Sequence, residues 1–149
     1  MPVYQETRHV EVHARPEDCF AVLTDYDHLP EWQSRICECR VLERDQQGRG
    51  SVVEYAIDAK LRVVRYRLRH TYDEPRSIGS EYLEGDFKQF AGDYEFTDHD
   101  GVTDVEFRLR IDPGFSVPGR IARMLGQAVM GKSLQDVKAR VEEVAGGAQ

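Results

Sequence analysis

The stretch FKQFAGDYEFTDHDGVTDVEFRLRI, residues 87–111, contains two runs in which apolar and polar residues alternate. The residues that share the apolar face of each run are Phe90, Gly92, Tyr94 and Phe96, then Val105, Phe107, Leu109 and Ile111. The Asp100-Gly101 pair between the runs is typical of a tight β-hairpin turn. This pattern predicts two antiparallel strands with one buried face and one face in water.

Further runs with strand character lie on the N-terminal side of this hairpin. Together with the hairpin strands at 87–97 and 102–111 they make seven predicted strands, the others being 3–13, 35–43, 51–58, 61–72 and 78–84. A short helix is predicted from Pro16, because proline suits the first helical position and Glu17 and Asp18 favour a helix N-terminus.

A long helix is predicted from Pro118 to about Val144, after the last strand. Its apolar residues recur every three or four positions, as Ile121, Met124, Leu125, Ala128, Val137, Val141 and Val144. About 27 residues at 1.5 Å each give a helix of roughly 40 Å, long enough to cross the whole sheet. The expected fold class is therefore α+β, with a curved seven-stranded antiparallel sheet wrapped around a long C-terminal helix and short helices after the first strand.

The composition is that of a globular chain with many charged residues. It has 149 residues, a formal net charge of −7, 40% hydrophobic residues and 32% charged residues. This length predicts one domain over residues 1–149, and the absence of a long apolar run predicts no transmembrane segment and no signal peptide. Three cysteines argue against a disulfide scaffold and favour a cytoplasmic chain with reduced thiols. The acidic balance argues against DNA as a partner.

Three motifs resemble those of a known family. They are DYDHLPEW (residues 25–32), which is similar to a D-x-x-x-x-P-x-W stretch, EGDFKQFAGDYEF (84–96), which is similar to a G-x-F…G-x-(W/Y)-x-F hairpin, and FSVPGR (115–120), which is similar to the linker before the last helix. In this order the chain resembles the START-like, or SRPBCC, superfamily of polyketide cyclases/dehydrases and coenzyme-Q-binding-protein-like proteins. The resemblance implies the helix-grip fold over nearly the whole chain.

The resemblance also implies a cavity between the sheet and the long helix. Such cavities bind lipids, sterols, quinones or polyketides. Alternation places apolar and aromatic residues toward it, while core packing alone is the competing interpretation for each of them. The candidate ligand-binding residues are Trp32 at the mouth, then Tyr55, Tyr66, Leu68, Tyr82, Phe90, Tyr94 and Phe107 from the sheet, and Met124, Leu125 and Ala128 from the helix.

The first functional hypothesis is a carrier, chaperone or sensor that binds a hydrophobic small molecule without covalent chemistry and without a cofactor. The alternative is a polyketide aromatase/cyclase, for which His70 is the candidate acid/base because histidine titrates near neutrality. A tyrosine that some cyclases carry after the P-x-W-like stretch corresponds here to Ile36, which weakens this alternative. A hydrogen-bonded structural histidine is the competing interpretation of His70.

Two other patterns match known sites only formally. Residues 126–133, GQAVMGKS, fit the P-loop pattern, but they continue a helical stripe where a P-loop needs a strand and a looped backbone. The glycines are instead expected where the sheet or a ligand approaches the helix closely. His9 and His13 lie about 13 Å apart on a strand, and Cys37 and Cys39, expected on one strand face, have no second pair of ligands. No metal site is predicted.

Arg65, Arg67 and Arg69 are predicted to share one face of a strand. The favoured interpretation is a solvated sheet exterior, with acidic partners such as Glu54 or Glu81 on neighbouring strands. The alternative is a surface that contacts the ribosome or another protein partner.

Overall fold

The computed structural model describes residues 3–58, 63–114 and 119–147. The elements in chain order are β1 (Tyr4–Val12), α1 (Pro16–Leu23), the 3-10 helix η1 (Tyr26–His28), α2 (Leu29–Trp32), β2 (Ile36–Arg44), β3 (Gly50–Asp58), β4 (Val63–Asp73), β5 (Ser77–Gly85), β6 (Gln89–His99), β7 (Val102–Asp112) and α3 (Gly119–Gly147).

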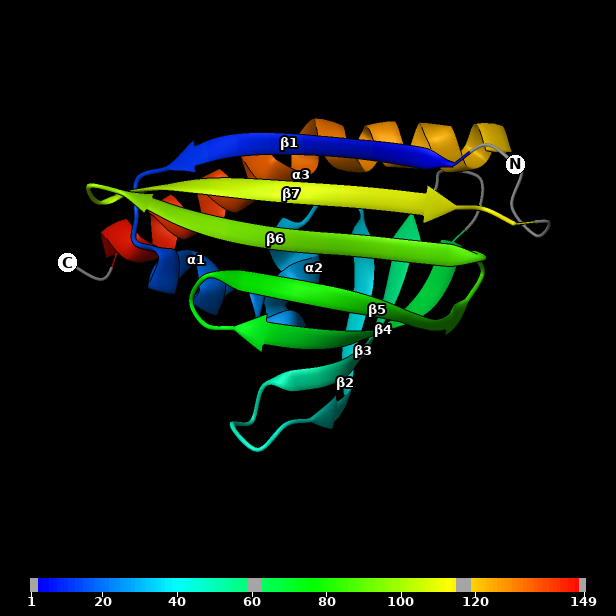
Figure 1. The fold of residues 1–149 in the computed structure, drawn as a ribbon, viewed down its shortest axis with the longest axis horizontal. Helices are drawn as coiled ribbons and strands as arrows, with labels where there is room; N and C mark the ends of the chain where they lie inside the picture. Colours follow the sequence, from blue (N-terminus) through cyan, green and yellow to red (C-terminus); the bar gives the residue numbers. More distant parts are fainter. Residues whose placement is uncertain (1–2, 59–62, 115–118, 148–149) are drawn as a thin grey trace.

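The strands form one curved antiparallel sheet in the order β1-β7-β6-β5-β4-β3-β2. Figure 1 shows the helices together on one side of this sheet, with α3 running behind β1 and β7. Helix α3 contacts β1, β7 and α1, whereas η1 and α2 contact β2 at the other edge. The predicted α+β class and the helix-grip arrangement are confirmed.

The β6–β7 hairpin has the register that the alternation predicts. Tyr94 faces Phe107 across the two strands, and Phe96 faces Val105. The turn places Asp100 at φ 55° and Gly101 at φ 90°, a left-handed backbone that aspartate tolerates and glycine adopts without strain. Buried pairs on one face and charged residues on the other hold this register, because a one-residue slip would expose every apolar side chain.

Helix α3 packs through a stripe that differs in part from the predicted one. Val137 and Val141 are fully buried as predicted, whereas Val144 is 46% exposed and its predicted burial is wrong. The stripe continues from Val141 to Ala145, which packs against the core, and this turns Val144 about 100° away from it. Pro118 and the side chain of Leu125 lie outside the described part of the chain.

The segment that fits the P-loop pattern is helical throughout, within α3. A Cβ on Gly126 would lie 2.3 Å from the Tyr4 ring, so glycine lets the helix approach β1 closely, as expected. The same expectation is wrong for Gly131, because nothing lies within 4 Å of a Cβ built there. The backbone therefore has no phosphate-binding loop at 126–133.

The prediction that Cys37 and Cys39 share a strand face is wrong. Cys37 is exposed and Cys39 is buried. A register shift between Ile36 and Glu38 interrupts the β2–β3 pairing, and an extra residue in a strand reverses the alternation locally. None of the helices in the described part of the chain combines the length and the apolar character of a membrane-spanning segment.

Candidate functional site

A cavity of about 90 Å³ lies between the sheet, the α1–α2 segment and the middle of α3. One water needs about 10–15 Å³ of such space, so the cavity can hold several waters or a small organic group. Most of its wall is apolar or aromatic. The lining residues are Leu23, Tyr26, Leu29, Gln33, Ser34, Arg35, Ile36, Tyr55, Ile57, Tyr66, Leu68, His70, Ile78, Phe90, Gly92, Tyr94, Phe107, Val129, Lys132, Ser133 and Asp136.

Stacked aromatic rings from neighbouring strands build the sheet wall of the cavity. The Tyr55 and Tyr66 rings, whose residues pair across β3 and β4, lie 5.2 Å apart between centroids. The Tyr66 ring in turn stacks on Phe90 of β6 at 4.3 Å. Because each ring is held on both sides, this wall is largely preformed.

Gly92 leaves room in this wall. A Cβ at this position would lie 3.2 Å from the Phe107 ring, so any larger residue would push against the ring stack or enter the cavity. The sheet is also loosely paired here. Among the described residues, the β5–β6 ladder consists of two residue pairs, Ser77–Glu95 and Ile78–Tyr94. Beyond Ile78 the Ser80 hydroxyl accepts from the Gly92 N–H at 3.0 Å in place of a backbone carbonyl.

One buried polar pair faces the cavity, formed by Tyr55 and His70. The Tyr55 hydroxyl lies 2.6 Å from His70 Nε2, and His70 Nδ1 lies 3.0 Å from the Gly79 carbonyl oxygen. A carbonyl can only accept, so Nδ1 carries the proton and Nε2 accepts from the tyrosine. Burial lowers the pKa of His70 to about 4 and raises that of Tyr55 well above its usual value. Both groups are therefore neutral near pH 7.

Tyr26 closes the wall beside this pair. Its ring stacks on the His70 imidazole at 5.2 Å, and its hydroxyl lies 2.8 Å from the Tyr72 hydroxyl. Tyr72 donates to the Gly50 carbonyl, so Tyr26 donates to Tyr72. A Cβ on Gly50 would lie 2.9 Å from the Tyr26 ring, so glycine allows this contact.

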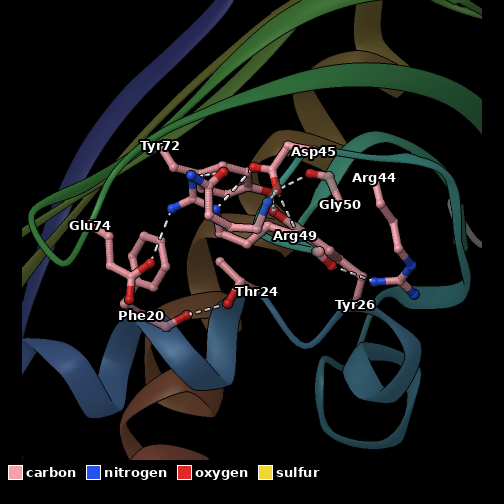
Figure 2. Close-up of polar contacts among 11 residues, drawn as sticks. Phe20, Thr24, Tyr26, Arg44, Asp45, Arg49, Gly50, Tyr72 and Glu74 are labelled. Atoms are coloured by element: carbon pink, nitrogen blue, oxygen red, sulfur yellow. Dashed lines mark hydrogen bonds and ion pairs between the residues drawn. The ribbon is translucent and has the colours of Figure 1, made fainter.

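Figure 2 shows how Tyr72 is held from its other side. The Arg49 guanidinium lies 4.7 Å from the centroid of the Tyr72 ring, a cation–π distance. Arg49 also pairs with Asp45 and with Glu74, each at 3.0 Å. Tyr72 in turn links Tyr26 of η1 to Gly50 of β3, so the contacts of Arg49 support the cavity wall at Tyr26 from the surface.

The opposite end of the cavity is polar. Ser34, between α2 and β2, donates to Asp136 of α3 through its backbone N–H at 3.0 Å and its hydroxyl at 2.8 Å. Arg35 follows Ser34, and Lys132 lies one helical turn before Asp136; both border the cavity. We call Arg35, Lys132 and Asp136 the charged mouth.

The structure brings most of the sheet residues singled out from the sequence to one cavity. His70 and six of the candidate ligand-binding residues line it, namely Tyr55, Tyr66, Leu68, Phe90, Tyr94 and Phe107. Their role in binding stays a prediction.

The other candidates whose side chains the structure describes lie off the lining. Trp32 packs half-buried against the core, and Tyr82 turns its hydroxyl to the Phe87 carbonyl at 2.7 Å. Met124 lies more than one helical turn before Val129, where the lining by α3 begins, and it borders a separate open groove together with Tyr4. Ala128 is half-buried outside the cavity, next to Val129, which does line it. The helix is thus rotated by one residue from the expected orientation.

Sequence reasoning missed the residues that come from the α1–α2 segment and the charged mouth. Tyr26 and Leu29 lie inside the motif that carried the family resemblance, but their direction depends on how η1 and α2 pack against β2 and the sheet. Ser34 and Asp136 are 102 residues apart in the chain. No local pattern pairs them.

The described residues contain no group of three histidine, cysteine or acidic side chains that could hold a metal ion. Cys19, Cys37 and Cys39 are free thiols. Burial raises the pKa of Cys19 to about 11 and that of Cys39 to about 12, so neither is an activated nucleophile.

The fold is shared with solved structures of low sequence identity. A START superfamily protein from Mycobacterium smegmatis is 21% identical, with a TM-score of 0.82 over 94% of this chain and 98% of that one. The ZhuI aromatase/cyclase from Streptomyces sp. R1128 is 17% identical, with a TM-score of 0.80 over 94% of both chains. The di-domain aromatase/cyclase StfQ of the steffimycin biosynthetic pathway is 17% identical, with a TM-score of 0.74 over 97% of this chain and 53% of that one.

No curated protein sequence matches the chain. The family model of polyketide cyclases/dehydrases and lipid transport proteins matches residues 12–138, which include every residue that lines the cavity. The chain therefore belongs to the polyketide cyclase/dehydrase and lipid transport family.

Proposed function

We propose that this protein binds a hydrophobic small molecule, such as a lipid, quinone or polyketide-like compound, in the cavity between the sheet and α3, as a carrier, chaperone or sensor. The observation that carries the proposal is the cavity itself, which is walled by stacked aromatic rings and left partly unfilled by α3. An apolar ligand that enters it exchanges water for close contact with these rings, which is the main source of affinity in such sites.

The Tyr55–His70 pair supplies the polar contact that orients the ligand. Tyr55 already donates to His70, so its oxygen can accept a hydrogen bond from a ligand hydroxyl. Both side chains are neutral, and a neutral pair can lie against an apolar ligand without the desolvation cost of a charge.

The test uses the neutral fluorescent probe N-phenyl-1-naphthylamine and a variant that fills the cavity. Val129→Trp places a large ring at a lining position of α3, while Gln135→Trp places the same ring at an exposed position of the same helix. The proposal expects the wild type and Gln135→Trp to bind the probe, and Val129→Trp to bind it at least about tenfold more weakly. Native mass spectrometry of freshly purified protein then identifies a co-purified ligand. A wild type that binds no apolar probe, or equal affinities in all three proteins, would reject the proposal.

The second candidate function is that of a polyketide aromatase/cyclase, and the Tyr55–His70 pair is the observation that favours it. His70 Nε2 could accept the α-proton of a poly-β-ketone, the resulting enolate carbon would bond to the carbon of a second ketone, and Tyr55 would protonate that ketone's oxygen, after which the proton on His70 returns to Tyr55. The low pKa of His70 makes it a weak base, so this function ranks second. Incubation with a linear poly-β-ketone decides: a product distribution that differs from the spontaneous one, and returns to it in His70→Gln, supports the cyclase, and an unchanged distribution rejects it.

A further inference from the structure

The charged mouth carries two cations, Arg35 and Lys132. Arg35 is half-buried and Lys132 is exposed, and neither has an ion-pair partner within 4 Å among residues 3–58, 63–114 and 119–147. On β4, by contrast, each of three arginines pairs with a glutamate; these are Arg65, Arg67 and Arg69. Other cations without an ion pair among the described residues, such as Arg110 and Arg140, lie outside the cavity lining, so Arg35 and Lys132 are distinguished by their place beside an apolar cavity.

Asp136 is the acidic residue of the charged mouth, and it is occupied by another partner. Its Oδ2 atom accepts both the N–H and the hydroxyl of Ser34. It forms no ion pair with Lys132, although the two are four residues apart on one helix, a spacing at which such pairs commonly form. The remaining lining of the cavity contains no other carboxylate, and His70 is neutral. The lining therefore has a surplus of one positive charge.

We propose that the ligand of this cavity is an amphipathic acid, with an apolar body against the aromatic wall and one carboxylate at the charged mouth between Arg35 and Lys132. This inference rests on the proposed binding function and specifies the chemical class of the ligand. The carboxylate would compensate the surplus charge, and a guanidinium binds a carboxylate with two parallel hydrogen bonds.

The position of the mouth fits this orientation of the ligand. Arg35 directly precedes β2, and its backbone carbonyl accepts a hydrogen bond from the N–H of Asp58, the last residue of β3, at 2.9 Å. Tyr55 lies three residues before Asp58 along β3, about 10 Å at the rise of a strand. An acid with a ring or short chain of that length reaches the Tyr55–His70 pair while its carboxylate stays at the partly hydrated rim, where a charge is least costly.

The experiment compares 2-naphthoate with its neutral analogue 2-naphthamide, each measured by displacement of N-phenyl-1-naphthylamine. The variants are Arg35→Gln, Lys132→Gln and the double variant. Arg140→Gln is the matched control, because it removes one positive charge from α3 at a position outside the cavity lining. We expect the wild type and Arg140→Gln to prefer the acid about tenfold, the single variants to lose part of this preference, and the double variant to bind both compounds equally.

The amide separates this inference from the function on which it rests. Equal affinities of acid and amide in the wild type, or a preference for the acid that survives in the double variant, would overturn the amphipathic-acid proposal and leave hydrophobic binding intact. Failure of the neutral probe and of both naphthalene compounds to bind the wild type would overturn both. Weakening of the acid, but not of the amide, by 0.5 M NaCl would support the role of the two cations.

Discussion

The inner and outer faces of β3 and β4 are made by the same backbone and have opposite chemistry. On the inner face Tyr55, Tyr66 and His70 are buried, neutral and hydrogen-bonded or stacked. The residues between them along each strand turn charged side chains to the outer face, as Arg65 does next to the buried Tyr66. The comparison teaches that this sheet keeps its interior free of charge and places charges where water reduces their cost.

The outer charges are also matched to one another. Glu54 lies 3.0 Å from Arg40 and 2.9 Å from Arg67, and Arg65 lies 2.8 Å from Glu38. Arg69 lies 3.9 Å from Glu81. The interpretation of Arg65, Arg67 and Arg69 as a solvated and paired sheet exterior accounts for these contacts, and the alternative of a ribosome or protein partner finds no support in the family match.

The largest expected difference between the two faces is in packing. Leu68→Ala removes a buried side chain that is 3% exposed and should lower the free energy of unfolding by about 2–5 kcal/mol. Arg69→Ala, one residue away on the outer face, should change it by less than about 0.5 kcal/mol. Urea denaturation followed by circular dichroism measures both. Similar losses in the two variants would show that the faces are not packed differently.

A second difference is in the response to acid. The pKa of His70 is about 4 in the folded protein because of burial, whereas an unfolded chain has a value near 6.5. The unfolded state therefore binds the proton first as the pH falls, so the contribution of neutral His70 is complete above about pH 6.5 and is lost progressively toward pH 4. Between pH 7 and pH 5 the wild type should lose about 2 kcal/mol more than His70→Gln.

The His70→Gln variant is the reference because glutamine keeps one donor and one acceptor and does not titrate. Carboxylates with lowered pKa values, such as Glu54, destabilise both proteins alike at low pH. Equal pH dependence of unfolding in the two proteins would contradict the burial of a neutral histidine. Chemical denaturation at each pH gives the comparison.

The smallest expected effect concerns the outer ion pairs. The pKa of Glu54 lies below its usual value. The hydrogen bond from Arg67 lowers it most, partial burial raises it, and the hydrogen bond from Arg40 lowers it further. Glu54→Gln should cost about 1 kcal/mol or less at low salt. The loss should shrink in 1 M NaCl, where charges are screened over about 3 Å. Glu43→Gln, an exposed carboxylate on β2, serves as control, and a loss that is independent of salt would contradict the ion-pair account.

The two faces also show how far sequence patterns reach. Alternation predicted the seven strands to within a few residues, because the side-chain direction in a strand repeats every two residues wherever the pairing is regular. Alternation failed at Cys37, where a bulge inserts one residue, and the helical spacing failed at Val144, where the buried stripe of α3 passes through Ala145 instead. Both failures come from contacts with distant elements, which propensity does not contain.

The candidate site was predictable to a similar extent. The aromatic wall from β3, β4, β6 and β7 follows from strand alternation, and His70 belongs to it for the same reason. Met124 and Ala128 were assigned to the lining because a helical pattern gives the apolar face but not its rotation against the sheet. That rotation is a matter of packing between α3 and β1, where Gly126 closely approaches Tyr4.

The sequence by itself determined the α+β class, the family and the division of each strand into an apolar and a charged face, because these are local periodicities that any compact fold of the chain must satisfy. Only the tertiary structure decided that a cavity remains between sheet and helix, that Tyr55 donates to His70, and that Arg35 and Lys132 border this cavity with no ion-pair partner among the described residues. The physical reason is that these features depend on distances between elements far apart in the chain. Ångström differences in packing set those distances.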